Sequence, residues 1–322
     1  MELDAKIFVA GHRGLVGGAI LRRLQAAGCT NLLGRSSRQL DLRDQAAVAR
    51  FFGREQPAYV FLAAARVGGI RANSTYPAQF IYDNLMIESN IINQAYLHGV
   101  KKLLFLGSSC IYPKFAPQPI KEEYLLDGKL EPSNEPYAVA KIAGITLCRA
   151  YNREYGTCFI SAMPTNLYGP GDNFDLLDSH VIPALMRRFH LARVAGAPEV
   201  AVWGTGAPRR EFLHVDDLAD ACFFLMQHYR ESDIVNVGVG RDLTIRELAA
   251  LVAAVTGFKG QVRFDPSQPD GTPRKLLDVS RLTALGWQAR IPLEEGLRRT
   301  YQWFRRSRWA RQTAESPAAP SP

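Results

Sequence analysis

The sequence predicts an α/β protein built on a doubly wound parallel β-sheet. Two observations support this fold class. Short β-rich runs alternate with longer helical stretches through the first half of the chain, and a glycine-rich turn follows the first of these runs. Strands separated by helices in this way form parallel sheets that are covered by helices on both faces. The 322 residues, 47% of them hydrophobic, suffice for a large core.

The predicted elements follow one another in the order that such a sheet requires. We expect strands at residues 6–10, 31–33, 59–63, 102–106 and 159–163, and helices ending near residue 27 and spanning 78–98 and 137–155. Each predicted strand is a short run rich in apolar side chains. The second half is less regular, and its Gly-, Pro- and Asp-rich segments predict loops at 167–178 and 266–273.

Composition and charge argue against several classes of protein. No apolar run reaches the ~20 residues of a membrane-spanning helix, and the polar N-terminus does not resemble a signal peptide. The net charge is +8, and much of it lies near the C-terminus, where we interpret the arginines as a solvated helix face and expect no nucleic-acid or membrane contact. These arginines are Arg298, Arg299, Arg305, Arg306, Arg308 and Arg311. The five cysteines lack the spacing of a disulfide framework or a zinc site, so we expect a cytoplasmic protein without a metal.

The first indication of a site is the glycine-rich turn, which follows the first predicted strand and opens the first predicted helix. It reads Gly11-His12-Arg13-Gly14-Leu15-Val16-Gly17. Glycines at these places allow a tight turn and a close approach of the backbone to a pyrophosphate, while the helix N-terminus offers free N–H groups. The turn therefore predicts a dinucleotide site in a Rossmann-type domain.

The residues after the second predicted strand indicate which dinucleotide binds. Proteins that bind NAD usually carry Asp or Glu here, which accepts a hydrogen bond from the ribose 2′-OH. This chain instead has Arg35 and Arg38 and no acid. Guanidinium groups suit a 2′-phosphate, and Arg13 can add to them, so we predict NADP(H). The alternative is that these arginines are ordinary surface residues. Asp41 and Leu42 follow and are expected near the adenine.

A second set of residues predicts chemistry at a carbonyl group. Tyr137 and Lys141 are four residues apart in a predicted helix and so lie on one face. The ammonium of Lys141 is expected to lower the pKa of the Tyr137 phenol and to hold the nicotinamide ribose. Ser108 comes just after a predicted strand, where parallel strands end at a ligand crevice. Together these residues can polarise a carbonyl group and exchange its proton.

With these motifs the chain resembles the extended short-chain dehydrogenase/reductase superfamily to about residue 305. Within it, the chain resembles the GDP-L-fucose synthases. The segments that carry this resemblance are GHRG at 11–14, ARVGGI at 65–70, LGSSCIYP at 106–113, PTNLYGP at 164–170, SHVIPAL at 179–185 and PDGTPRK at 269–275. The family epimerises GDP-4-keto-6-deoxy-D-mannose at C3 and C5 and then reduces its C4 ketone with NADPH. The resemblance implies this activity.

The resemblance makes Cys110 the base and His180 the acid of the epimerisation. A C4 ketone acidifies the protons on C3 and C5, and inversion needs a base on one face and an acid on the other. Cys110 lies two residues after Ser108, so both would point into one crevice if the backbone there is extended. A nearby cation would favour the thiolate. His180 follows the loop at 167–178, which we expect to cover the substrate.

The resemblance also implies further binding residues. The cofactor set adds Leu106, Gly107, Lys141, Pro164, Asn166, Leu167 and His180 to the glycine-rich turn. The substrate set is Asn166, Arg188, Trp203, Arg210, Asp270 and Lys275. Basic side chains would neutralise the diphosphate, and Trp203 would lie near guanine or the sugar. Asn166 could face either cofactor or diphosphate, and each arginine taken singly could instead form a surface salt bridge.

The expected organisation has two domains. Residues 1–166 and 205–238 would form a discontinuous NADP-binding domain, and 167–204 and 239–312 a smaller, mixed α/β nucleotide-sugar domain. Residues 313–322, rich in Ser, Pro and Ala, are expected to be a disordered tail. The resemblance also implies a homodimer, in which the helices at 78–98 and 137–155 would pair across a twofold axis.

Two other functions compete with this interpretation. A nucleotide-sugar 4-epimerase or 4,6-dehydratase would favour an acid after the second strand, and a dehydratase an Asp-Glu pair where Ser109 and Cys110 stand. A non-catalytic NADP-binding protein on the same fold would be expected to lack at least one of Ser108, Tyr137 and Lys141. The sequence departs from both patterns.

Overall fold

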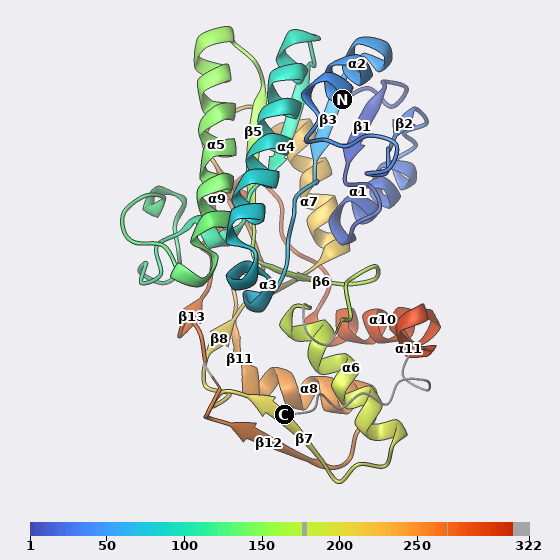
Figure 1. Cartoon of the computed structure of the whole chain (residues 1–322), viewed down its shortest axis with the longest axis vertical. Helices are drawn as coiled ribbons and strands as arrows, with labels where there is room; N and C mark the ends of the chain where they lie inside the picture. Colours follow the sequence, from blue (N-terminus) through green and yellow to red (C-terminus); the bar gives the residue numbers. More distant parts are fainter. Residues whose placement is uncertain (176–178, 269, 312–322) are drawn as a thin grey trace.

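The computed structural model describes residues 1–175, 179–268 and 270–311, so the tail expected at 313–322 lies outside the described residues. Its centre is a six-stranded sheet with the strand order β10-β5-β4-β3-β1-β2 (Figure 1). The strands are β1 (Ile7–Ala10), β2 (Leu32–Leu33), β3 (Tyr59–Leu62), β4 (Lys102–Leu106), β5 (Phe159–Pro164) and β10 (Val235–Val237). All neighbouring strands are parallel. The predicted fold class is confirmed.

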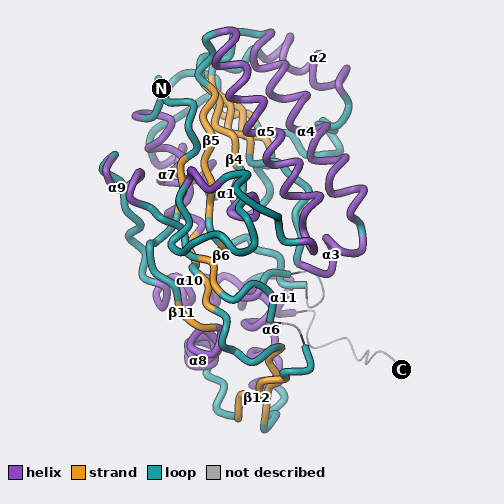
Figure 2. The backbone as a smooth tube through the Cα atoms, turned by 90° about the vertical axis from the view of Figure 1, so that its left-hand side faces the viewer, coloured by secondary structure: helices purple, strands orange, loops and turns teal. Residues whose placement is uncertain are grey.

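Helices cover both faces of this sheet, as Figure 2 shows from the side. On one face lie α1 (Leu15–Ala26) and α7 (Val215–His228), and on the other α2 (Gln45–Glu55), α4 (Pro77–Leu97) and α5 (Glu135–Tyr155). Successive residues of β1 alternate between the two sides: Ile7 packs into the first core, and Phe8 packs into the second. Because both faces are covered, the inner strands are apolar throughout.

The structure departs from the expected elements at several points, and two of them are short strands. β10 closes one edge of the sheet but is not among the strands expected from the sequence, because three residues carry little pattern. The segment expected as a loop from residue 167 begins with a strand, β6 (Asn166–Tyr168), which pairs in parallel with β9 (Phe212–His214). That pairing joins residues 46 positions apart, and no local signal encodes it.

The second half of the chain builds a smaller body with its own core, below the sheet in Figure 1. Its helices are α6 (Val181–Val194), α8 (Ile245–Thr256), α10 (Leu293–Arg306) and α11 (Arg308–Arg311). Its strands are β7 (Glu199–Trp203) with β12 (Gln261–Asp265), and β8 (Arg209–Arg210) between β11 (Leu243–Thr244) and β13 (Arg274–Lys275). Shorter elements are α3 (Ile70–Thr75), α9 (Ser280–Ala284), η1 (Ser109–Ile111), η2 (Glu122–Tyr124) and η3 (Pro132–Asn134). The exact domain boundaries stay a prediction.

The basic C-terminal segment lies on α10 and α11. Arg298 pairs with Glu294, and Arg299 pairs with Glu295, each one helical turn away. These arginines belong to an exposed helix face, as the sequence indicated. Within the described ranges, no helix combines the length and the apolar character needed to cross a membrane.

Candidate active site

The glycine-rich turn joins β1 to α1, and at two of its positions no residue with a side chain would fit. Gly11 has a φ of +84°, and a Cβ there would lie 2.8 Å from the carbonyl oxygen of Ala63. A Cβ on Gly17 would lie 2.2 Å from the carbonyl oxygen of Gly11. Gly14 is the N-cap of α1 and has no side chain to cap the helix. The first N–H groups of α1 are therefore presented to a ligand, and the backbone can approach it closely.

A pocket of about 270 Å³ lies between this turn and the loop after β2. Its lining residues are Gly11, His12, Arg13, Gly14, Arg35, Ser36, Ser37 and Arg38, which include no acid. The Arg35 guanidinium is held by Glu55 at 3.1 Å, whereas Arg13 and Arg38 are exposed. Burial and the charges of Arg13 and Arg35 lower the pKa of His12. The pocket therefore fits a phosphate group on the ribose, with Arg13 and Arg38 as its most accessible cations.

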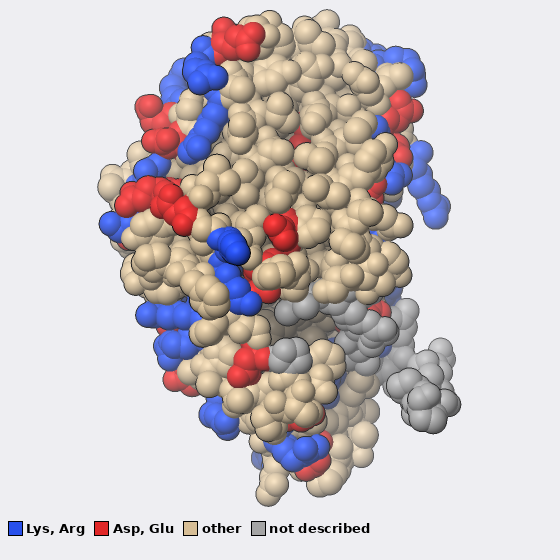
Figure 3. Space-filling model, turned by 60° about the vertical axis from the view of Figure 1, so that its left-hand side comes forward, with Lys and Arg blue, Asp and Glu red and all other residues tan. Residues whose placement is uncertain are grey.

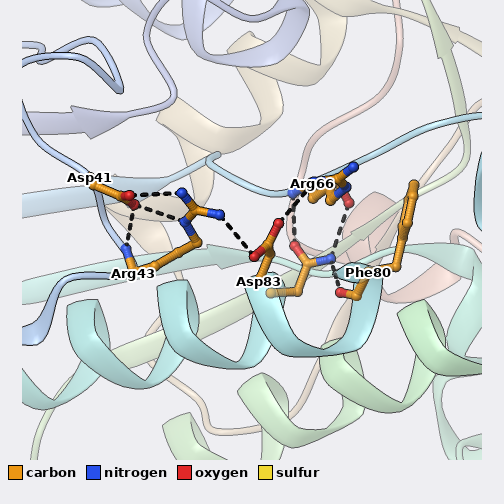
Figure 4. Close-up of polar contacts among 6 residues, drawn as sticks. Asp41, Arg43, Arg66, Phe80 and Asp83 are labelled. Carbon is orange, nitrogen blue, oxygen red and sulfur yellow. Dashed lines mark hydrogen bonds and ion pairs between the residues drawn. The ribbon is translucent and has the colours of Figure 1, made fainter. Parts of the chain in front are cut away.

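Asp41, which is expected near the adenine, is already engaged with its neighbours (Figure 4). Arg43 binds both carboxylate oxygens of Asp41, at 3.0 and 2.8 Å, and this contact lowers the pKa of Asp41. Arg43 also reaches Asp83 on α4 at 3.1 Å, and Asp83 binds Arg66 after β3 at 3.0 Å. The carbonyl oxygen of Leu42 accepts a hydrogen bond from α4. This series of ion pairs connects the loops after β2 and β3 to α4. An adenine contact of Asp41 or Leu42 stays a prediction.

Ser108 comes two residues after the end of β4, at the carboxyl edge of the sheet. Its hydroxyl accepts the N–H of Cys110 at 3.2 Å and so caps the 3₁₀ helix η1. The extended backbone expected through Cys110 is therefore wrong, because this cap turns the chain directly after Ser108. Ser108 also forms a side-chain hydrogen bond with Tyr137, which projects from α5. The two hydroxyl groups that the sequence paired are in contact.

Cys110 meets a lysine from the smaller body. The ammonium of Lys275 donates to the Cys110 Sγ at 3.5 Å. Lys275 is on β13, which pairs with β8 and sets Lys275 beside Arg210. His180 is the N-cap residue of α6, and desolvation, followed by the charge of Lys275, lowers its pKa. The structure thus brings Cys110 and Lys275 into contact, and the charge of Lys275 also acts on His180.

The environment of Tyr137 differs from the one expected. Burial, and then the charges of Cys110 and Glu88, raise the pKa of the phenol, against a lowering by the hydrogen bond with Ser108. Lys141 does not lower it as predicted, because its ammonium forms an ion pair with Glu88 at 2.8 Å. Sequence reasoning missed Glu88. The sequence feature that could have revealed it is an acidic residue among the apolar residues of a helix face that packs into the core.

The remaining substrate candidates lie on the smaller body or beside it. The guanidinium of Arg188 on α6 lies 5.2 Å from the centre of the exposed Trp203 ring, and burial lowers the pKa of Arg188. Burial also lowers the pKa of Arg210, against a raising by Asp270. Asp270 accepts hydrogen bonds from the backbone and hydroxyl of Thr205 at 2.7 and 2.8 Å. Asp270 therefore has a structural partner, which the sequence did not reveal.

The other cofactor candidates follow β4 and β5. Gly107 leaves room for Met163, whose Sδ would be 2.4 Å from a Cβ there. The Asn166 amide donates to the carbonyl oxygen of Glu211 at 2.9 Å, which anchors β6 to the start of β9. Leu106 ends β4, Pro164 ends β5, and Leu167 lies in β6. No cluster of His, Cys, Asp or Glu within the described ranges could hold a metal ion.

A parallel dinucleotide-binding sheet with Ser108, Tyr137 and Lys141 at its carboxyl edge defines an extended short-chain dehydrogenase/reductase. A sequence profile described as "NAD dependent epimerase/dehydratase family" matches residues 7–238. GDP-L-fucose synthase 1 of Arabidopsis thaliana is 62% identical over 303 residues, which cover 94% of each protein. GDP-L-fucose synthase of Escherichia coli K12 is 59% identical over 93% of this chain and 96% of that protein. The chain belongs to the GDP-L-fucose synthases of this epimerase/dehydratase family.

A solved structure extends the likeness to three dimensions. The structure titled as a GDP-L-fucose synthetase from Naegleria fowleri bound to NADP superposes with a TM-score of 0.88 at 31% identity. It covers 94% of this chain and 95% of that one. The likeness therefore includes both the sheet and the smaller body.

Proposed function

We propose that this enzyme converts GDP-4-keto-6-deoxy-D-mannose into GDP-L-fucose, by epimerisation at C3 and C5 and NADPH-dependent reduction at C4. Family membership supports the overall reaction, and the comparisons confirm the predicted enzyme class and NADP(H). The observation that carries the proposal is the contact of Cys110 with Lys275 beside the hydrogen-bonded Ser108 and Tyr137. A thiol base and a carbonyl-reducing set thus share one site.

The epimerisation uses residues from both halves of the chain. Cys110 removes a proton next to the C4 ketone, with the Lys275 ammonium 3.5 Å from its Sγ. The hydroxyl groups of Ser108 and Tyr137 donate hydrogen bonds to the enolate oxygen. His180 returns a proton from the opposite face. Once Cys110 has released its proton to water and His180 has taken one up, the same cycle inverts the second carbon.

The reduction uses Tyr137 as an acid. NADPH supplies the hydride that reaches C4. Because burial raises the pKa of Tyr137, its phenol stays protonated and can give its proton to the C4 oxygen. Lys141 lies one turn further along α5, where it would hold the nicotinamide ribose.

The proposed binding residues divide between the two ends of the crevice. The backbone of the glycine-rich turn would hold the pyrophosphate of NADP, and Arg13 and Arg38 its 2′-phosphate. Arg188, Arg210 and Lys275 would hold the diphosphate of the sugar substrate, with Trp203 offering an exposed aromatic surface. The other cofactor and substrate positions given by the resemblance are proposed for the same roles.

We further propose a cytoplasmic homodimer that pairs through α4 and α5. These two helices lie side by side (Figure 1) and expose several large apolar side chains. Tyr82, Leu97 and Tyr155 are 62%, 59% and 47% exposed. The surface over these helices carries few charged residues in Figure 3. An exposed apolar patch of this kind marks an interface.

Mass spectrometry of the product formed in D2O tests the proposed reaction. The enzyme with GDP-4-keto-6-deoxymannose and NADPH should yield a reduced sugar with solvent deuterium on two carbons. In Cys110→Ser this deuterium should be lost while NADPH still binds, because the base is gone but the dinucleotide site is intact. Cys158→Ser, at a half-buried cysteine on the way into β5, is the matched control and should behave as wild type.

Each other outcome has a distinct meaning. Reduction without deuterium in the wild type would identify a simple ketoreductase and overturn the epimerase assignment. Undiminished deuterium in Cys110→Ser would overturn Cys110 as the base. No turnover at all would exclude this sugar as the substrate.

A further inference from the structure

A buried ion pair joins α4 to α5 beside the site. Glu88 and Lys141 are each 1% exposed, and the Glu88 Oε1 lies 2.8 Å from the Lys141 Nζ. The ion pair involves the Oε1 of Glu88 alone, and neither Glu88 oxygen has a hydrogen-bond partner among the described residues. The same ammonium lies 4.6 Å from the centre of the Phe105 ring. The carboxylate therefore depends on one cation for its stabilisation.

The chain makes room for this carboxylate. A Cβ on Gly144 of α5 would lie 2.8 Å from the Glu88 Oε2 and 2.4 Å from the Phe105 ring. Glycine in the middle of a helix costs roughly 0.5–1 kcal/mol relative to alanine. A buried ion pair is also no reliable source of stability, since well-packed apolar residues often replace one without loss. Stability alone therefore does not account for Glu88.

We propose that Glu88 is a positioning residue for the reduction: it holds the Lys141 ammonium in place and balances its charge, which keeps the phenol proton on Tyr137 available for transfer. This inference rests on the proposed function. Glu88 acts through Lys141 and touches no reacting atom.

The charges around Tyr137 support this role. Lys141 approaches from the same helix, Glu88 from α4 and Cys110 from η1, while Ser108 forms the hydrogen bond. The charge of Glu88 is also one cause of the raised pKa of Tyr137. Without that charge, the ammonium of Lys141 would be unbalanced and would favour the phenolate. The Tyr137 phenol would then lose its proton at a lower pH, and the enzyme would lose its proton donor.

The pH dependence of the reduction in Glu88→Gln tests the proposal. Glutamine keeps the shape of the side chain and removes its charge. The alkaline limb of kcat/KM for the sugar should move about one pH unit or more toward lower pH, the size of effect expected from an unbalanced charge at this range. Glu88→Asp keeps the negative charge but moves it away from Lys141, because the side chain is shorter. Its alkaline limb should stay at the wild-type pH, while kcat falls and KM is unchanged. Glu154→Gln, an exposed acid at the end of α5, is the control and should match wild type.

Two readouts separate this proposal from the proposed function. An inactive wild type would contradict the proposed function alone. In that case the tyrosinate absorbance of Glu88→Gln, with Tyr137→Phe as the reference, still reports whether Tyr137 titrates at a lower pH. A folded Glu88→Gln whose alkaline limb and tyrosinate titration match wild type would overturn the proposal. If Glu88→Gln does not fold, a Glu88→Asp enzyme with wild-type kcat would overturn it.

Discussion

Arg35 and Arg38 follow the same strand but have different surroundings. Arg35 is fixed by Glu55 and lies 5.7 Å from the centre of the Phe51 ring, so its guanidinium stabilises the end of α2. Arg38 lines the pocket beside Arg13 and is exposed. The sequence shows two arginines without an acid, and only their neighbours distinguish them.

We expect Arg38→Ala to raise the KM for NADPH by about 10- to 100-fold, since a hydrogen bond to a charged group contributes roughly 1.5–3 kcal/mol. Arg35→Ala should raise it much less and should instead lower the melting temperature. Steady-state kinetics with NADPH and NADH measure this, and the KM for NADH should hardly change in either variant. A larger effect of Arg35→Ala on the NADPH KM would reverse the assignment.

At the scale of elements, His214 shows how a side chain holds a helix in place. The residue is buried, and its Nδ1 accepts the N–H of Asp216 at 3.2 Å as the N-cap of α7. Its ring meets Tyr168 edge-on at 5.4 Å. Burial lowers the pKa of His214 to about 4. The imidazole is therefore neutral in the folded protein at neutral pH and can accept this bond.

This cap predicts a loss of stability in acid. In the unfolded chain a histidine takes up its proton near pH 6.5, whereas in the folded protein His214 does so near pH 4. The unfolded state therefore binds more protons between these values, and the free energy of unfolding should fall by about 2–3 kcal/mol as pH drops from 6.5 to 4. Denaturant unfolding at several pH values measures this. His214→Asn keeps a capping oxygen without the titration, so its curve should lack that part of the slope; an identical slope would contradict the assignment.

The elements themselves differ in how far the sequence predicts them. β1, β3, β4 and β5 were predicted because their apolar runs are continuous, as expected of strands covered on both faces. β6 and β10 were not, because each has three residues and forms only against a distant strand. The chain expected to be extended through Cys110 is instead η1, because the cap that Ser108 supplies depends on side-chain geometry.

At the scale of the whole molecule, the apolar surface over α4 and α5 predicts a dimer. Leu97→Asp would place a charge in the proposed contact, so we expect a monomer of half the mass by size-exclusion chromatography with light scattering. Val194→Asp replaces a similarly exposed apolar residue on α6, 66% exposed, and should leave the dimer intact. A monomeric wild type, or a dimeric Leu97→Asp, would contradict this interface.

The sequence by itself determined the class of fold, the dinucleotide turn and the spacing of Tyr137 and Lys141, because each depends on residues close together in the chain. Turn conformation, helix faces and buried strands are local properties. Only the tertiary structure decided that Lys275 meets Cys110, that Glu88 pairs with Lys141 and that Arg35 is held by Glu55. Each of these contacts joins residues from different elements. These groups act on one another only after their elements have packed together and excluded water.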